Sequence, residues 1–328
     1  MSRRLLVFAP NWLGDAVMAL PAIADLQRAS PGTTIDVAAR PAIAPLVPLI
    51  PGGGRAVLLA GGRSSLAAVK AGRYDAALLF PNSFNTAWLV RRAGVPERWG
   101  YRHEFRSVLL THAIAPPVRV HQAAFYQGLT TALGFPLGPL TPHLDVPQDL
   151  RMMGRDRLAE AGWDEQTRLV AFAPGAAFGG AKRWPPARFA AVVDVLARDG
   201  VRAVLVGAGG DAKAGAEVVA AVHTGLRPIN LIGATDLSTL AAVLVHCRAL
   251  VTNDSGAMHF AAALGVNVTA VFGPTNEHET RPLGAGRISV VHTDTWCRPC
   301  MLRECPLTHG CMTGVSEDTV LGETRMSL

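Results

Sequence analysis

The chain has 328 residues, of which 49% are hydrophobic and 17% charged, and its 33 glycines and 23 prolines are spread along its length. This composition excludes a disordered or fibrous chain and is typical of a well-buried α/β protein of two domains. A net charge of +6 suggests an anionic partner, but an aromatic fraction of 6%, with no stacking platform or basic helix, argues against nucleic acid.

The first residues, MSRRLLVFAPNWLG, carry charges before a short apolar run. That run is too short for a secretory signal and leads into a Gly-Asp turn without a cleavage site. Elsewhere no stretch approaches the ~18 apolar residues that cross a bilayer. We therefore expect a cytoplasmic protein that contacts a membrane only at its surface.

Short strands alternate with helices in the N-terminal half. An apolar strand at residues 5–9 and a loop at 10–15 precede a helix over 16–27, with Pro21 in its first two turns. Further strands are expected at 35–39, 56–59 and 75–80, and a helix around 86–93. Strands joined in this way predict a parallel, doubly wound sheet whose exit loops open on one edge.

A proline-dense segment at residues 136–148 lacks either periodicity and is interpreted as the approach to an interdomain linker. A second alternating series follows, with strands at 169–173, 201–206, 229–232 and 249–251 and helices at 150–161, 186–198, 237–246 and 258–264. We predict two doubly wound, Rossmann-like domains, 1–150 and 151–328, facing a central cleft, with the last helix able to pack back on the first domain.

The segment 251–274, VTNDSGAMHFAAALGVNVTAVFGP, reads as strand, polar turn, helix and strand. Its turn places Asp254, Ser255, Gly256 and His259 where a helix begins beyond the carboxyl end of a strand. Such a position favours a phosphate, because unpaired N–H groups and the helix dipole meet there. An isolated pattern of this kind more often has a structural role, in which Asp254 or Ser255 caps the helix and His259 is a hydrogen-bonded core residue.

Charged side chains occur in two of the predicted exit loops. Asp15 is either a helix cap or a general base, and Gly14 before it would let an acceptor approach the backbone. Lys182 and Arg183 lie on a glycine-rich loop, where a cation either neutralises a departing diphosphate or is merely exposed. Together these residues suit group transfer from a nucleotide-activated donor.

Arginines dominate the charge between residues 81 and 120. This segment holds six arginines and two glutamates: Arg91, Arg92, Arg98, Arg102, Arg106, Arg119, Glu97 and Glu104. A guanidinium binds carboxylates and phosphates with two parallel hydrogen bonds, so this excess favours discrete anionic groups over a diffuse field. A solvated basic face remains an equal alternative.

Several enzyme classes lack their essential motifs in this chain. The glycine turn at residues 207–210 does not have the G-x-G-x-x-G spacing of a dinucleotide site. No H-E-x-x-H, G-x-S-x-G or Walker loop is present either, which argues against a zinc peptidase, a serine hydrolase or a P-loop enzyme.

The sequence resembles glycosyltransferase family 9, the ADP-heptose:lipopolysaccharide heptosyltransferases, and within it the heptosyltransferase II branch. The matching segments run through nearly the whole chain: NWLGDAVM (11–18), PNSFNTAWLVRRAGVPERWGYRHEFRSVLL (81–110), HQAAFY (121–126), FAPGAAFGGAKRWPPARF (172–189), TNDSGAMHFAAALG (252–265), FGPTNEHET (272–280) and CPLTHGCM (305–312). The D-S-G-x-x-H and K-x-W-P elements are shared across the family, whereas PNSF and the cysteine-rich tail are typical of the branch.

The resemblance implies a GT-B fold and an inverting, metal-independent transfer with no cofactor. L-glycero-D-manno-heptose would pass from ADP-heptose to the first heptose of the inner-core acceptor, heptosyl-Kdo-lipid A, at the cytoplasmic face of the inner membrane. Asp15 would be the base and Lys182 would stabilise the leaving ADP. The donor would be bound by Asp254, Ser255, Gly256, His259, Pro274 and Thr275, and the acceptor by Gly14, Asn82, Ser83 and Arg102.

Four of the five cysteines lie in one C-terminal segment: Cys297, Cys300, Cys305 and Cys311. They suffice for a tetrahedral zinc, but their intervals are shorter than those of two separate C-x-x-C knuckles. Reduced thiols and a local disulfide remain alternatives. For the whole chain, two other functions stay open: a family 9 transferase with another donor or acceptor, and a non-catalytic protein that binds a nucleotide sugar.

Overall fold

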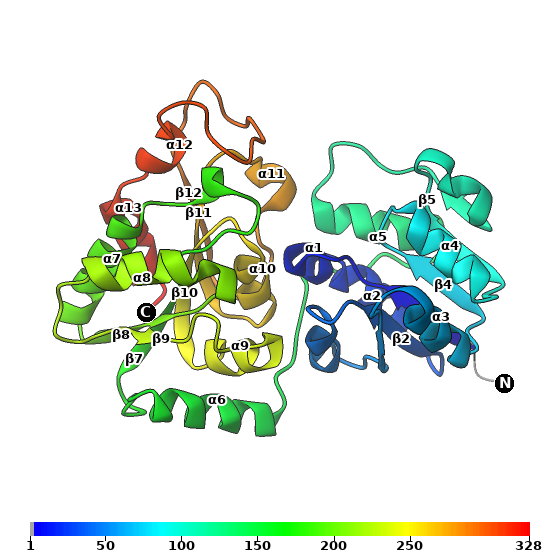
Figure 1. Ribbon diagram of the computed structural model, residues 1–328, viewed down its shortest axis with the longest axis horizontal. Helices are drawn as coiled ribbons and strands as arrows, with labels where there is room; N and C mark the ends of the chain where they lie inside the picture. The colour runs from blue at the N-terminus through cyan, green and yellow to red at the C-terminus, as the bar shows by residue number, and fades with distance from the viewer. Residues whose placement is uncertain (1–2) are drawn as a thin grey trace. The chain divides into compact units, whose positions relative to one another are not determined.

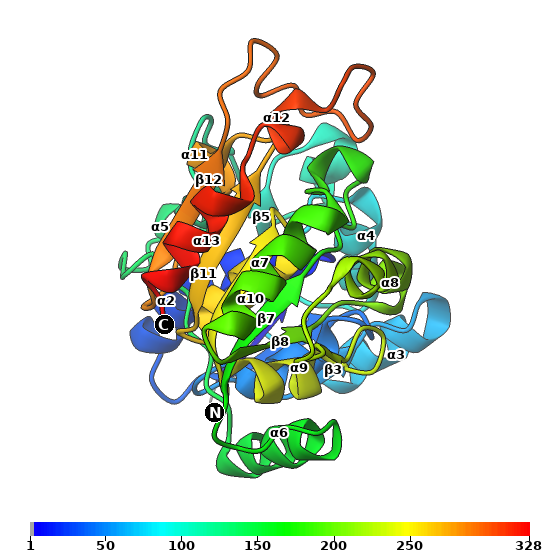
Figure 2. The same ribbon diagram turned by 90° about the vertical axis from the view of Figure 1, so that its left-hand side faces the viewer.

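The computed structural model describes residues 3–328, which form two compact units (Figures 1 and 2). The first ends at Asp145 and the second is Val146–Leu328, so the division falls inside the proline-rich segment 136–148. Within the described residues, no helix has both the length and the apolar character required to cross a membrane.

The first unit is built on a parallel six-stranded sheet with the order β3-β2-β1-β4-β5-β6. Its strands are β1 (Arg4–Phe8), β2 (Thr34–Ala39), β3 (Ala56–Leu58), β4 (Ala76–Leu79), β5 (Glu97–Tyr101) and β6 (His112–Ile114). Because β1 pairs with both β2 and β4, the strand order reverses between β1 and β4. Ligands of open α/β sheets bind at such a reversal, beyond the carboxyl ends of the strands.

Helices cover both faces of this sheet. They are α1 (Leu13–Met18), α2 (Leu20–Ala29), α3 (Gly62–Ala71), α4 (Phe84–Arg92) and α5 (Gln122–Ala132), with 3₁₀ helices η1 (Ala44–Leu49) and η2 (Glu104–Leu109). On one face Leu6, Phe8 and Leu79 from the strands pack with Val69 and Val90 from α3 and α4. On the other, α2 packs against α5.

The expected single helix over residues 16–27 is wrong, because the chain forms α1 and α2 with a break at Ala19. Pro21 explains the break: it has no N–H for the carbonyl of Val17, and its ring clashes with that carbonyl. The expected loop at 10–15 also ends earlier than predicted. Asp15 lies in the first turn of α1 and not in the loop before it.

The second unit repeats the plan with the order β12-β11-β10-β7-β8-β9, again all parallel. Its strands are β7 (Arg168–Ala173), β8 (Val201–Leu205), β9 (Ile229–Asn230), β10 (Cys247–Asn253), β11 (Asn267–Phe272) and β12 (Ile288–His292). The order reverses between β7 and β10. The two predicted doubly wound parallel sheets are thus confirmed.

The helices of this unit are α6 (Gln148–Glu160), α7 (Pro186–Arg198), α8 (Ala212–Ala221), α9 (Leu237–Leu244), α10 (Gly256–Ala263), α11 (Glu277–Thr280), α12 (Gly310–Thr313) and α13 (Glu317–Arg325), with 3₁₀ turns η3 (Gly180–Lys182) and η4 (Gly209–Asp211). The helix α6 packs on α9, where Gly154 allows contact with the backbone of Ala242. The last helix, α13, lies along β11 and β12 and against α7 within the second unit (Figure 2). Its expected packing on the first domain stays a prediction.

Candidate functional site

A cavity of about 310 Å³ opens in the first unit at the reversal of its strand order. The loops after β1 and β4, the first turn of α1 and the helix α5 all contribute to its lining. Its lining residues are Pro10, Asn11, Trp12, Asp15, Phe80, Pro81, Asn82, Ser83, Gln122, Phe125 and Tyr126. Three residues predicted from sequence, Asp15, Asn82 and Ser83, are therefore brought together here.

Asp15 is held by a tyrosine that sequence reasoning did not single out. The hydroxyl of Tyr126 donates to Asp15 Oδ1 over 3.0 Å. The ring of Tyr126 is fixed edge-on by Phe80 and Phe125, with centroid separations of 5.2 and 5.7 Å. Burial, together with the negative charge of Asp15, raises the pKa of Tyr126, so the phenol keeps its proton and remains a donor.

The side chain of Asn82 accepts a hydrogen bond from a buried arginine. Arg106 donates through Nη1 to the carbonyl of Pro81 and, at 3.4 Å, to Asn82 Oδ1. Its side chain is fully buried, and this burial lowers the pKa of Arg106 to about 10. Nε and Nη2 of Arg106 have no hydrogen-bond partner among residues 3–328. Arg106 thus supports the backbone of the cavity wall from behind.

The other predicted acceptor residues are placed differently. Ser83 lines the cavity but also caps α4, accepting from the N–H of Thr86 at 3.2 Å. Gly14 precedes Asp15 in α1 and Arg102 lies exposed after β5, and neither lines this cavity. The contribution of α5 to the cavity lining was not predicted. The available sequence signal was the spacing of Gln122 and Tyr126, which are four residues apart and therefore share a helix face.

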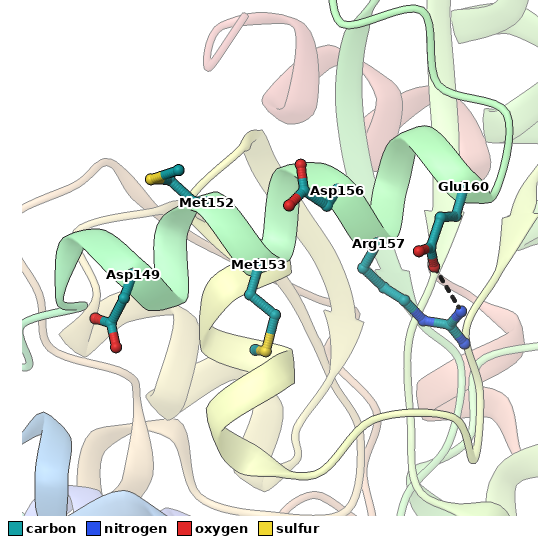
Figure 3. A pocket seen from close by; sticks show the side chains of 6 residues that line it. All are labelled: Asp149, Met152, Met153, Asp156, Arg157 and Glu160. Carbon is teal, nitrogen blue, oxygen red and sulfur yellow. Dashed lines mark ion pairs between the residues drawn. The ribbon is translucent and has the colours of Figure 1, made fainter.

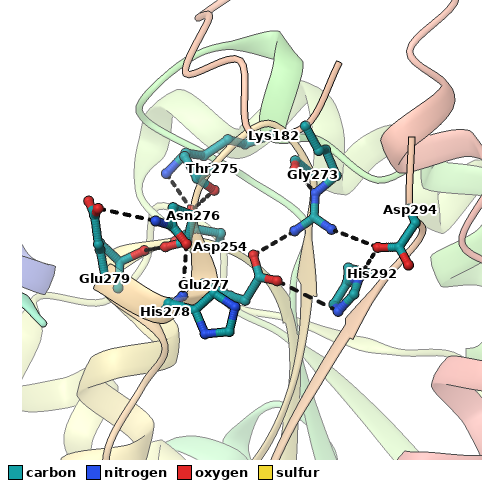
Figure 4. A network of polar contacts seen from close by, with 12 residues as sticks. Lys182, Asp254, Gly273, Thr275, Asn276, Glu277, His278, Glu279, His292 and Asp294 are labelled. Carbon is teal, nitrogen blue, oxygen red and sulfur yellow. Dashed lines mark hydrogen bonds and ion pairs between the residues drawn. The ribbon is translucent and has the colours of Figure 1, made fainter. Parts of the chain in front are cut away.

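In the second unit, two predicted residues donate to one carboxylate oxygen of a third. Lys182 Nζ and the hydroxyl of Thr275 each donate to Asp254 Oδ2 at 2.5 Å (Figure 4). Asp254 is 5% exposed. These residues follow β7, β11 and β10, which are neighbours in the sheet, so the cluster lies at the reversal of the strand order. The carboxylate therefore fixes the ammonium of Lys182 at the ligand-binding edge.

Hydrogen bonds with one asparagine hold both ends of the loop that carries Lys182. Asn253, fully buried at the end of β10, accepts from the N–H of Trp184 at 3.0 Å and donates to the carbonyl of Pro174 at 2.8 Å. Within the loop, Lys182 Nζ lies 4.7 Å from the ring centroid of Phe178. Sequence reasoning missed Asn253 and Trp184. A buried amide next to the D-S-G turn was the available signal, since it requires polar partners.

The remaining predicted donor residues surround this cluster. Ser255 is the N-cap residue of α10, but its side chain makes no cap bond and instead shares a hydrogen bond of 3.2 Å with Thr252. Gly256 begins the helix, and His259 is buried on it. Pro274 accepts from the N–H of Met301 at 2.9 Å. The first N–H groups of a helix lack partners in a preceding turn and favour an anion, although that of Met258 in α10 donates to the carbonyl of Ser255 at 3.2 Å.

A second polar network lies beside the first and was not predicted. Arg298 donates to the carbonyl of Gly273 at 2.6 Å and to Glu277 at 2.7 Å, while His292 approaches both Glu277 and Asp294 (Figure 4). An adjoining cavity of about 480 Å³ is lined by Glu277, His278, Arg281, Val290, His292 and Asp294. Arg298 therefore joins the cysteine-rich segment to the loop after β11.

The cysteine-rich segment also contacts the Lys182 loop. The N–H of Ala181 donates to the carbonyl of Arg303, and that of Gly180 to Glu304, both at 2.9 Å. All five cysteines are free thiols. Within the described part of the chain, no three His, Cys, Asp or Glu side chains are grouped to hold a metal, so neither the zinc nor the disulfide alternative gains support.

A further concavity, of about 470 Å³, lies along α6 (Figure 3). Its lining comes from this one helix and consists of Asp149, Met152, Met153, Asp156, Arg157 and Glu160, with an ion pair of 3.5 Å between Arg157 and Glu160. Carboxylates outnumber cations here, so this surface does not suit a diphosphate.

Comparison with known proteins gives a consistent result. The model of glycosyltransferase family 9 (heptosyltransferase) matches residues 63–310. The chain is 33% identical to the lipopolysaccharide heptosyltransferase 2 of Escherichia coli over 300 residues, 85% of each sequence. It is 31% identical to the solved ADP-heptose lps heptosyltransferase II of E. coli, with a TM-score of 0.86 and coverage of 99% and 98%.

A family 9 structure from Veillonella parvula, at 22% identity, gives a TM-score of 0.84 with coverage of 99% and 97% and supports the fold. The predicted GT-B fold is confirmed by these likenesses, and the resemblance noted in the sequence is confirmed as well. The chain belongs to glycosyltransferase family 9, the heptosyltransferases.

Proposed function

We propose that this protein transfers L-glycero-D-manno-heptose from ADP-heptose to the first heptose of the lipopolysaccharide inner core, with heptosyl-Kdo-lipid A as acceptor. The observation that carries the proposal is the similarity over most of the chain to proteins named as heptosyltransferases of this type. The polar sites at the two strand-order reversals fit the two halves of such a reaction.

Asp15 is the proposed general base. Its carboxylate lines a cavity large enough for part of a sugar and is oriented by Tyr126. It would take the proton of the acceptor hydroxyl as that oxygen bonds to the anomeric carbon of the donor. The bond from this carbon to the β-phosphate oxygen breaks in the same displacement, ADP departs with the electron pair, and the anomeric configuration inverts.

The donor is proposed to bind at the Lys182–Asp254–Thr275 cluster. The ammonium of Lys182 would meet the diphosphate and stabilise the charge that grows on the leaving ADP. Because Asp254 is occupied by two donors, we assign it to positioning Lys182 and not to direct contact with phosphate. The start of α10, with Ser255, Gly256 and His259, and the loop at Pro274 would enclose the rest of the donor.

The acceptor is proposed to bind in the cavity of the first unit. Asn82 and Ser83 would hydrogen-bond its sugar hydroxyls, and Gly14 would allow close approach to Asp15. Arg102 lies outside the cavity and would contact carboxylates or phosphates farther along the acceptor. All four proposed acceptor residues thus belong to loops and helix starts of the first unit.

We also propose that the reaction needs no metal ion and takes place at the cytoplasmic surface of the inner membrane. Lys182 and the helix start would supply the positive charge that a metal provides in other transferases. Turnover measured after treatment with a chelator, and again with added Mg²⁺, tests this point. A loss of activity that Mg²⁺ restores would refute it.

The direct test uses Asp15→Asn, which keeps the shape of the side chain but removes the base. We expect product formation from ADP-heptose to fall by roughly 100-fold or more, within the usual range for general-base catalysis, while ADP-heptose binding is retained. Near-normal turnover by this variant would show that Asp15 is not the base. UDP-sugars as efficient donors would favour another family 9 activity, and nucleotide binding without acceptor-dependent ADP release would favour a non-catalytic protein.

A further inference from the structure

The first unit carries a cluster of exposed apolar side chains on α4 and η2. Phe84 and Trp88 on α4 are each 45% exposed, while Phe105 and Val108 on η2 are 85% and 77% exposed. Isolated exposed apolar residues are ordinary, but neighbouring ones on adjacent elements mark an interaction surface. We call these four residues the apolar patch.

Contacts link the two elements that carry the apolar patch. Phe84 and Trp88 lie four residues apart on the same face of α4, and their rings stack with centroids 6.4 Å apart and planes within 17°. The helices α4 and η2 pack against each other. Arg91, on the same face of α4, donates to the backbone carbonyl of Val108 at 3.4 Å and so joins the two elements.

Cations adjoin the patch along the chain, since Arg91 and Arg92 end α4 and Arg102 precedes η2. Arg91, Arg92 and Arg102 are exposed, and no ion pair involving their guanidinium groups occurs among residues 3–328. The acidic residue on η2 itself is Glu104. An apolar surface flanked by unpaired arginines is complementary to anionic headgroups above acyl chains, because aromatic rings partition into the interface and guanidiniums pair with phosphates.

The patch also adjoins the acceptor cavity. Asn82 and Ser83 line that cavity, Ser83 caps α4, and Phe84 is the first residue of the helix. Trp12, 61% exposed, lines the cavity as well. A lipid-linked acceptor would therefore keep its acyl chains in the bilayer while its sugars enter the cavity.

We propose that the apolar patch with Arg91, Arg92 and Arg102 is the surface by which this protein docks on an anionic lipid bilayer. The inference extends the proposed function, since it names the surface that brings the cavity to a membrane-embedded acceptor. A protein partner or a second copy of the chain would need acidic groups opposite the arginines, and we treat those occupants as outcomes of the test.

The test measures co-sedimentation of the protein with vesicles of phosphatidylcholine alone or mixed with phosphatidylglycerol. We expect binding to the mixed vesicles only. Loss of Trp88 and Phe105 in the double variant W88S/F105S should weaken this binding by at least about tenfold, because the apolar surface that enters the bilayer is removed. Each of R91Q and R92Q should weaken it by roughly fivefold, and added salt should do the same.

Matched controls are Leu137→Ser, which removes an exposed apolar side chain elsewhere in the first unit, and Arg63→Gln, which removes an exposed arginine on α3. Both should bind vesicles as the unaltered protein does. Thermal unfolding of every variant verifies that these surface changes leave the fold intact.

Equal vesicle binding by the patch variants and the controls, or no binding by the unaltered protein, would overturn the proposal. So would a concentration-dependent dimer that the patch substitutions dissociate, because the surface would then be a self-association interface. Transfer to a water-soluble, deacylated acceptor separates this inference from the proposed function: patch variants should retain that transfer, whereas a wrong function would show none with any variant.

Discussion

Lys182 Nζ and Asp254 Oδ2 lie 2.5 Å apart, with side-chain exposures of only 13% and 5%. The carboxylate thus holds the ammonium at the edge of the sheet where ligands of such folds bind. Replacing Lys182 by Ala should lower kcat/KM by roughly 100-fold, as for other groups that stabilise developing charge. Asp254→Asn should have a smaller effect on kcat/KM, and steady-state kinetics with ADP-heptose would measure both.

The control for this pair is Lys213→Ala, which removes an exposed lysine on α8. It should leave kcat and KM unchanged. If Asp254→Asn were as damaging as Lys182→Ala in both parameters, the carboxylate would do more than position the ammonium, and direct contact with the donor would have to be assigned to it.

Tyr126→Phe removes the hydroxyl that donates to Asp15. A hydrogen bond to a carboxylate favours its charged form, so its loss should move the acidic limb of the pH–rate profile to higher pH. We also expect kcat to fall by roughly tenfold, because hydrogen bonds to charged groups contribute about 1.5–3 kcal/mol. The phenol itself should add no alkaline limb, since burial raises the pKa of Tyr126.

A profile of kcat/KM against pH for Tyr126→Phe and the unaltered protein checks this prediction. Tyr74→Phe serves as the control, since it removes a buried tyrosine hydroxyl in the same unit that bonds Asp36 and not Asp15. An unmoved acidic limb in Tyr126→Phe would mean that the tyrosine does not orient the base.

Asp36 supplies a pH-dependent contribution to folding stability. Burial raises the pKa of Asp36, but hydrogen bonds from Tyr74 and from the backbone and guanidinium of Arg55 outweigh it, so the pKa lies below its ordinary value. A lowered folded-state pKa stabilises the protein above the unfolded pKa, and this contribution is lost as the pH falls through the folded one.

Asp36→Asn should therefore lower the free energy of unfolding by about 2 kcal/mol at pH 7, with the difference shrinking on acidification below about pH 4. Urea unfolding at several pH values measures both quantities. Asp156→Asn on the exposed side of α6 should change stability little at any pH. A difference for Asp36→Asn that stayed constant down to pH 3 would contradict the assignment.

The cysteines should react with an alkylating reagent in two groups. Burial raises the pKa of Cys247 to about 12, and burial together with the neighbouring thiols raises that of Cys311. The thiolate is the reactive form, so both should react slowly, whereas the partly exposed Cys297, Cys300 and Cys305 should react first. Mass spectrometry after timed alkylation at pH 8 would give the order.

Elemental analysis of the same sample addresses the zinc alternative. Stoichiometric zinc with all four C-terminal cysteines protected from alkylation would show a metal site. Faster labelling of Cys311 than of Cys297 would show that the segment opens in solution.

The sequence predicted the parts of this protein that depend on local patterns. Apolar runs such as residues 169–173 and 201–206 form buried parallel strands, as predicted. In these segments the length of the apolar run and the turn residues that bound it both favour a strand. The D-S-G-x-x-H turn and the lysine loop were assigned to the ligand-binding edge, and the structure brings Lys182, Asp254 and Thr275 together.

What the sequence could not give depends on side-chain contacts between distant segments. Tyr126 reaches Asp15 across 111 positions, and Asn253 reaches the Pro174 carbonyl across 79, so neither partner is visible in a local window. The short strands β5 and β6 were missed because Glu97, Arg98 and His112 interrupt any apolar run. The helix break at Ala19 required weighing Pro21 against strong apolar periodicity.

In the second sheet β10 pairs with β7 on one side and β11 on the other, and the three loops that leave these strands hold Asp254, Lys182 and Thr275. A slip of one residue in either of these two ladders would move the three side chains apart. Insertions and deletions in β7, β10 and β11 should therefore be rare among relatives. They should be more frequent around the cavity of the first unit, where loop residues can change without altering the pairing of any strands. Relatives that decorate different sugars are expected to differ there first.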